Sequence, residues 1–278
     1  MGNVRSGPGN CDYAGGVPDV YQPVFPERRT GSIYVAGEGA ESSLHFQISE
    51  ISQVRTAEVK MIRVFSMSVN GKDFLDSDWT PYLSEERKRA AARRRQTDAR
   101  QQYLGAEALV NRALEIVGAD VRLPARFVRT PYGKPYLETQ CGFFVNWSHS
   151  GEYAVCAVSD LEVGIDIQEM SKTPGERLIR RILRPSEYEE WEREPREKQT
   201  ETFYRYWTAK ESFLKMKGTG FYAPLDSFAV RLRGDGASVR ELKGNTEYVC
   251  RFLPFEDPGY LAAVCGEDME TAPKIEYL

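Results

Sequence analysis

The sequence predicts an α+β protein made of two similar halves, each with a long helix packed on a small antiparallel sheet. Helical periodicity appears twice along the chain, and each time alternating stretches of strand type accompany it. The stretches EYAVCAVSD and GYLAAVCGED also resemble each other, because each is a tyrosine-led strand that contains a cysteine and ends in a turn. We therefore expect a pseudo-twofold arrangement of the halves, with a cleft between them.

Three segments follow from the pattern. Residues 1–60 are rich in Gly, Pro and Ser and lack periodicity, so we expect an N-terminal extension that is poorly structured or atypical. Regular alternation begins with the strand predicted at 61–69. We assign the N-terminal α+β half to residues 61–168 and the C-terminal half to residues 169–278.

In the first half, a long helix is predicted from Ser84 to about Val117. Ser84 suits the N-cap, two glutamates suit the first turn, and a glycine follows the end. Strands are predicted at 125–130, 142–147, 153–159 and 163–168. In the last of these, alternation puts two isoleucines on one face and Asp166 and Gln168 on the other. That polar face is either solvated or converges on a cation.

In the second half, a helix is predicted from about Glu201 to Lys217, with strands at 227–232, 247–255, 260–266 and 274–278. One face of the helix is apolar, while Glu211 and Lys215 lie one turn apart on another face. Taken alone, these two residues are explained by a surface ion pair worth a few tenths of a kcal/mol.

Composition excludes several classes of function. The chain has 41% apolar and 28% charged residues, as a soluble globular protein has, and no apolar run long enough to cross a bilayer. Its net charge of −4 argues against nucleic acid and acidic membranes as partners, although ERKRAAARRR at 86–95 forms one basic run. Five scattered cysteines without a C-x-x-C favour a reducing cytoplasm, and two histidines exclude a histidine-rich metal site.

Four motifs in order resemble the 4′-phosphopantetheinyl transferase family, in its larger, pseudo-dimeric, surfactin-synthetase-activating class. They are YGKPYL at 132–137, FVNWSHSG at 144–151, GIDI at 164–167 and WTAKESFLK at 207–215. The segment at 220–232 is also similar to the one that follows the catalytic helix in that class. The resemblance covers about residues 61–278.

This resemblance implies a reaction and its participants. The phosphopantetheine arm of coenzyme A would move to a serine of an apo acyl or peptidyl carrier protein of peptide or polyketide synthesis, releasing adenosine 3′,5′-bisphosphate. Magnesium would be the cofactor, and the enzyme would be a monomer with one site between its halves. The alternative is a coenzyme A-binding relative with impaired turnover, because Gln168 stands where many relatives have glutamate.

The resemblance also implies the site residues. Asp166 and Glu211 would hold magnesium, with Gln168 as a neutral third oxygen donor. Glu211 would also act as the base for the serine hydroxyl, and Lys215 would neutralise phosphate charge. His149 would contact phosphate.

Further residues are expected to bind the coenzyme. In the glycine-containing loop they are Tyr132, Gly133, Lys134 and Pro135, and in the next motif they are Ser148, His149 and Ser150. Lys215 joins them at the diphosphate. For the 3′-phosphate, the family uses basic residues of the first helix, and the candidates are Arg87, Arg89, Arg93 and Arg94.

Overall fold

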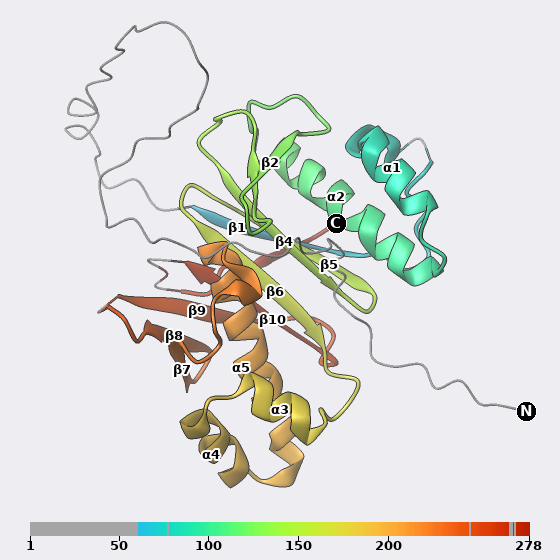
Figure 1. Cartoon of the computed structure of the whole chain (residues 1–278). Coiled ribbons are helices and arrows are strands. Elements are labelled where there is room, and N and C mark those ends of the chain that lie inside the picture. Colours follow the sequence, from blue (N-terminus) through green and yellow to red (C-terminus); the bar gives the residue numbers. More distant parts are fainter. Residues whose placement is uncertain (1–60, 77, 245, 267–268, 270) are drawn as a thin grey trace, which may run out of the picture. The chain divides into compact units, whose positions relative to one another are not determined.

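The computed structural model describes residues 61–278, except 77, 245, 267, 268 and 270 (Figure 1). The extension predicted at 1–60 lies outside the described residues. The described part has the predicted α+β class, with helices packed on antiparallel sheets. None of its helices is long and apolar enough to cross a lipid bilayer. The division into halves at 168/169 stays a prediction.

The first sheet has the strand order β11 (Ile275–Tyr277), β1 (Ile62–Ser68), β5 (Tyr153–Ser159), β4 (Phe144–Ser150). Its neighbours are antiparallel, except that β11 runs parallel to β1. The sheet therefore takes one edge strand from the end of the chain. Helix α2 (Thr97–Ile116) packs on it through buried residues such as Leu109 and Leu114, and a hairpin of β2 (Phe127–Arg129) and β3 (Pro135–Leu137) lies beside it.

The second sheet is antiparallel throughout. Its strands lie in the order β6 (Val163–Glu169), β10 (Tyr260–Gly266), β9 (Glu247–Leu253), β8 (Gly236–Glu241), β7 (Phe228–Arg233). Helix α5 (Arg196–Lys217) packs on one face, together with α3 (Glu176–Ile182) and α4 (Pro185–Arg193). Strand β8, with the sequence GASVRE, was not predicted.

Three buried clusters hold these elements together. One lies between α2 and the first sheet, and a second lies between α5 and the second sheet. The third joins the two sheets, where Ile165 and Ile167 of β6 pack with Val155 and Ala157 of β5. Because these isoleucines face the other sheet, the alternate residues of β6 face α5.

Two predicted helix boundaries were wrong. The helix expected from Ser84 to Val117 is two helices, α1 (Glu85–Ala92) and α2, because the chain leaves helical geometry before Gln96, which is extended. Helix α5 begins at Arg196, earlier than the predicted Glu201. Two short 3₁₀ turns, η2 (Thr80–Tyr82) and η3 (Gly220–Tyr222), complete the described part.

Candidate active site

Strand β6 and helix α5 approach each other very closely at Gly164. A Cβ atom built at Gly164 would lie 2.0 Å from the carbonyl oxygen of Ser212 and 2.3 Å from the amide nitrogen of Met216. Only glycine allows this approach, which explains the glycine at the start of GIDI. The next residue on the same face of β6 is Asp166, which therefore also faces α5.

Asp166 is the centre of a polar cluster. Lys215 Nζ donates to its Oδ1 over 2.6 Å, and Ser148 Oγ donates to the same oxygen over 2.9 Å. Gln168 Nε2 donates to Oδ2 over 2.8 Å. The Asp166 side chain is 2% exposed and the Lys215 side chain 22%, so the pair reaches solvent only through the lysine.

Glu211 is a second carboxylate beside this cluster. Its pKa is raised to about 7, first by burial and then by the negative charge of Asp166, while Lys215 acts in the opposite direction. A cation bound between the two carboxylates would relieve the negative charge that raises the pKa of Glu211. Glu211 and Lys215 are thus part of a buried network, and Lys215 reaches across to a strand 49 residues earlier in sequence.

The donor set fits a hard divalent cation. Two carboxylates and the neighbouring Gln168 supply oxygen atoms, the ligand type that magnesium prefers, and magnesium needs few protein ligands. Within the described residues, no group of three His, Cys, Asp or Glu side chains is arranged to hold a metal ion. The third candidate here is an amide, and it now presents its NH₂ group to Asp166.

The FVNWSHSG motif joins the two sheets by side chains. Strands β4 and β6 lie at facing sheet edges, and alternate polar residues of β4 bond to β6. The Ile165 amide donates to Asn146 Oδ1 over 2.9 Å, and the Glu169 amide donates to Ser150 Oγ over 3.0 Å. Ser148 lies between them and bonds to Asp166. Asn146 was not predicted to matter, although it shares the i, i+2, i+4 spacing of the two serines.

His149 lies in a positively charged region of the site. Its pKa is lowered to about 4, first because surrounding protein displaces water, and then by the charges of Lys215, Arg87 and Arg94. It nevertheless keeps an exposed surface. A neutral imidazole among three cations is an environment that favours an anionic ligand.

Two arginines of the basic run flank one aromatic ring. The guanidinium carbon of Arg87 lies 3.4 Å from the centroid of Tyr103, and that of Arg94 lies 4.1 Å from it. The break between α1 and α2 allows this, because it turns Arg94 back toward α2. Arg89, in contrast, is exposed and donates to the carbonyl oxygen of Glu85 in its own helix. Arg93 is the C-cap of α1.

The YGKP segment forms the turn between β2 and β3. Gly133 has a φ of 89°, which a residue with a side chain rarely adopts, and Pro135 begins β3. Tyr132 is 46% exposed and contacts Tyr222, which is 72% exposed, with ring centroids 5.2 Å apart. Tyr222 follows α5 in the segment at 220–232 that resembles the family, but it was not predicted as a site residue. Lys134 is buried, and its ammonium contacts Glu162 and the carbonyl of Met216.

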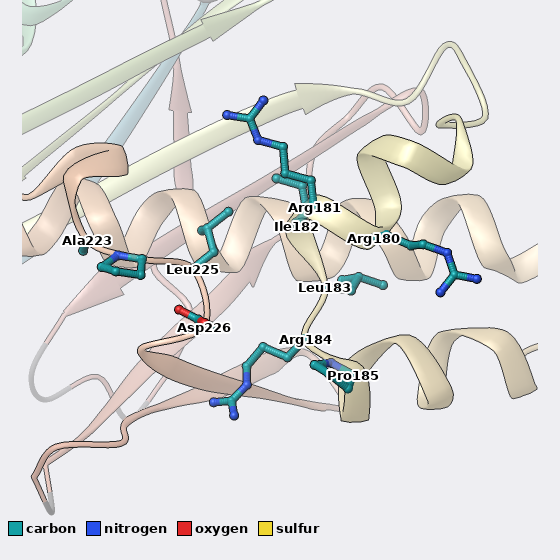
Figure 2. Close-up of a pocket in the computed structure, with 10 residues that line it drawn as sticks. Arg180, Arg181, Ile182, Leu183, Arg184, Pro185, Ala223, Leu225 and Asp226 are labelled. Atoms are coloured by element: carbon teal, nitrogen blue, oxygen red, sulfur yellow. The ribbon is translucent and has the colours of Figure 1, made fainter.

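A separate pocket of about 400 Å³ lies at the corner between α3 and α4 (Figure 2). Its lining includes Arg180, Arg181 and Arg184, but Figure 2 shows these three side chains pointing in different directions. Arg180 is also held by Glu176, at 2.7 Å. The pocket therefore does not bring its guanidinium groups to one point, and it contains none of the predicted site residues.

Comparison with known proteins assigns the chain to a family. Residues 162–265 match the model of the 4′-phosphopantetheinyl transferase superfamily. The chain is 35% identical over 191 residues to 4′-phosphopantetheinyl transferase Sfp of Bacillus subtilis strain 168, covering 66% of this chain and 82% of that protein. It is 34% identical over 200 residues to 4′-phosphopantetheinyl transferase psf-1 of Bacillus pumilus, covering 71% and 84%. It is 40% identical over 147 residues to another Bacillus subtilis 4′-phosphopantetheinyl transferase, covering 52% and 64%. The chain therefore belongs to the 4′-phosphopantetheinyl transferase superfamily.

Proposed function

We propose that this protein transfers the 4′-phosphopantetheine arm of coenzyme A to a serine of an apo carrier protein. The observation that carries the proposal is the Asp166–Lys215 pair, 2.6 Å apart, beside a second carboxylate, Glu211. Phosphoryl transfer requires positioned charge for the diphosphate and a base for the nucleophile. The cluster combines both requirements in one place, and membership of the superfamily supports the same chemistry.

In the proposed reaction, the serine oxygen of the carrier attacks the β-phosphorus of coenzyme A. Glu211 takes the hydroxyl proton, and the bond to the departing adenosine 3′,5′-bisphosphate breaks. A raised pKa near 7 suits a base that works near neutral pH. The Lys215 ammonium leaves Asp166 and donates to phosphate oxygens instead, where it stabilises the negative charge that develops on them. Magnesium, when bound, supplies positive charge to the diphosphate, and we propose Asp166, Gln168 and Glu211 as the residues that hold it.

At the nucleotide end, we propose Arg87 and Arg94 as the partners of the 3′-phosphate. Of the four candidate arginines, these two flank Tyr103 and act on His149. His149 would then donate to phosphate once the anion offsets the neighbouring cations. The YGKP turn, with Tyr132, Gly133 and Pro135, would contact the adenosine, and the exposed ring of Tyr222 extends that surface. Ser148 and Ser150 already bond to β6, so they would act on the coenzyme mainly by fixing Asp166 and its strand.

The proposed macromolecular partner is an apo acyl or peptidyl carrier protein, and neither nucleic acid nor a membrane is proposed. We also propose that the enzyme acts as a monomer in the cytoplasm. The four described cysteines, Cys141, Cys156, Cys250 and Cys265, are free thiols, as that compartment would leave them.

One observation favours the alternative of a coenzyme-binding relative with impaired turnover. Gln168 donates an amide hydrogen to Asp166, so the Gln168 side chain presents its NH₂ group, and not its carbonyl oxygen, to that carboxylate. Asp166, Glu211 and Lys215 are all retained, which favours the transferase.

A carrier-modification assay separates the two. An apo carrier protein is incubated with coenzyme A, magnesium and the enzyme, and its intact mass is measured. The proposal predicts a gain of one phosphopantetheine with wild type, and none with Asp166→Ala. Coenzyme A binding by calorimetry without any gain of mass on several acyl and peptidyl carriers would support the impaired relative instead.

A further inference from the structure

Lys134 is a buried lysine in the turn between β2 and β3, and the partners of its ammonium lie far away in sequence. Its side chain is 4% exposed. The ammonium contacts a carboxylate oxygen of Glu162, which lies just before β6, and the carbonyl oxygen of Met216 in α5. Tyr136 donates its hydroxyl hydrogen to the other Glu162 oxygen over 2.7 Å. We call these four residues the Lys134 cluster.

The contact with Met216 completes the end of α5. The last carbonyls of a helix lack partners within the helix and carry partial negative charge. The Gly218 amide donates to the carbonyls of Leu214 and Lys215, which leaves Met216 to be satisfied from outside. The Lys134 ammonium does this, and it brings a positive charge to the negative end of the helix.

Gly218 shapes the same contact. It has a φ of 70° as the C-cap of α5, and a Cβ built on it would lie 2.6 Å from Cδ of Lys134. The stem of the lysine therefore packs directly on the helix terminus. Burial lowers the pKa of Lys134, and Glu162 counteracts this effect. The side chain is held by packing along its stem and by polar partners at its tip.

The position of the cluster relates it to the site. Met216 directly follows Lys215, and Glu162 directly precedes the strand that carries Asp166. Lys134 thus connects the entry of β6 with the residue next to Lys215. We infer that Lys134 is a positioning residue, which holds the end of α5 against the start of β6 so that Lys215 faces Asp166, and that it does not itself bind the coenzyme. The inference rests on the proposed function for its kinetic consequence.

The test compares Lys134→Met with the double variant Lys134→Met/Glu162→Gln, which removes the link without leaving the Glu162 carboxylate unpaired. Lys217→Met is the matched control. Lys217 also lies in the last turn of α5 but pairs with Glu241 of β8 at 3.3 Å. Three quantities are measured for each protein: the dissociation constant of coenzyme A, kcat for carrier modification, and amide hydrogen exchange at residues 214–218.

A positioning role predicts one set of results. Lys134→Met should lower kcat about tenfold to a hundredfold, as small misplacements of a reacting group do, while coenzyme A affinity changes less than about threefold. The double variant should lose no more than the single one, because both remove the same link. Exchange at 214–218 should rise about tenfold in both variants, without coenzyme present, and stay unchanged in Lys217→Met.

Other outcomes overturn the inference. A loss of coenzyme A affinity of about tenfold or more in Lys134→Met with unchanged exchange would make Lys134 a direct coenzyme contact. Unchanged kcat and unchanged exchange would show that the cluster positions nothing. Failure of the proposed function looks different, because wild type itself would then modify no carrier, while the exchange measurement would still report whether Lys134 holds the end of α5.

Discussion

Helix α5 carries two lysines that each pair with a buried carboxylate, and the two pairs differ in access to solvent. Lys210 and Glu187 lie 2.6 Å apart, with side chains 1% and 2% exposed. Lys215 and Asp166 also lie 2.6 Å apart, but Lys215 is 22% exposed. The two lysines lie five positions apart in the helix, so their side chains point to different sides of α5.

The Lys210–Glu187 pair has the rest of its hydrogen-bonding capacity filled by backbone. Lys210 donates to the carbonyl of Ile182 over 2.8 Å, and the two oxygens of Glu187 accept the amides of Val230 and Arg184, each over 2.8 Å. A closed and satisfied pair of this kind fixes α5 against α4 and β7. It has no route by which to exchange partners.

The Lys215–Asp166 pair is open and lies beside a second carboxylate. Its partners are side chains, Ser148 and Gln168, which can rotate when a ligand arrives. Glu211, next to the pair, has a pKa raised to about 7 by burial and by the charge of Asp166. A cation bound between the two carboxylates, or an anion bound to Lys215, would stabilise this group of charges. The contrast teaches that solvent access and side-chain partners, more than ion-pair distance, separate a functional pair from a structural one.

The largest expected effect comes from breaking the closed pair. Glu187→Ala should lower the free energy of unfolding by about 3–5 kcal/mol, because it leaves the Lys210 charge buried and uncompensated. Denaturant unfolding measures this loss. As a control, Glu187→Leu/Lys210→Met should recover much of the stability. A loss below about 1 kcal/mol in Glu187→Ala, the size of an exposed pair, would contradict the account of this pair as closed.

The second effect concerns the open pair. Asp166→Ala should lower the rate of carrier modification by about a hundredfold to a thousandfold or more, comparable to losing one strong transition-state donor. Gln168→Ala should lower it less, because water can replace a neutral group at modest cost. Rates are measured across a magnesium titration. Equal losses in the two variants would contradict their unequal roles, and no loss in either would leave only a solvated strand.

A third prediction separates the arginines. Arg94→Ala should weaken coenzyme A binding about tenfold to a hundredfold, the size of a charge-assisted hydrogen bond. It should leave binding of 3′-dephospho-coenzyme A nearly unchanged. Arg89→Ala serves as the control, because Arg89 belongs to the same basic run but is exposed on α1, where it donates to the carbonyl oxygen of Glu85. If Arg89→Ala and Arg94→Ala weaken both ligands equally, the basic run acts only through general charge.

The smallest effect is a shift in the titration of His149. In the folded protein without ligand, its pKa is about 4, below the ordinary value of 6.5 that the unfolded chain retains. A neutral His149 therefore contributes stability above about pH 6.5, and this contribution is lost as the pH falls toward 4. Adenosine 3′,5′-bisphosphate should raise the pKa, because its charge offsets Lys215, Arg87 and Arg94.

Nuclear magnetic resonance can follow this titration in a His45→Gln background, since the chain has only two histidines. A midpoint near 6.5 that adenosine 3′,5′-bisphosphate does not move would place His149 away from the cationic region.

Much of the site's framework was predictable from local pattern. Alternation in β6 placed Asp166 opposite the buried isoleucines, and helical spacing placed Glu211 and Lys215 on a common face, as observed. The α+β class also followed from periodicity. These features depend on neighbours within a few residues, which is the range over which side-chain periodicity is fixed.

Contacts between distant segments were beyond that range. Nothing in YGKP indicates that Lys134 meets Met216, 82 residues later, and nothing in FVNWSHSG indicates that Asn146 and Ser150 bond to β6. The break before Gln96 was also missed, because helix propensity across 93–96 is not low and the contact of Arg94 with Tyr103 cannot be read from the local sequence. Such features appear only when the chain is folded.

The most direct test of the contrast between the two pairs is a parallel measurement on Lys215→Met and Lys210→Met. Carrier modification by intact mass and unfolding by denaturant are recorded for both, with wild type alongside. The account predicts that Lys215→Met loses about a hundredfold or more in rate while losing less than half the stability that Lys210→Met loses. A Lys215→Met enzyme that modifies carrier at the wild-type rate, or that is destabilised as much as Lys210→Met, would contradict the assignment of the open pair to catalysis and of the closed pair to the frame.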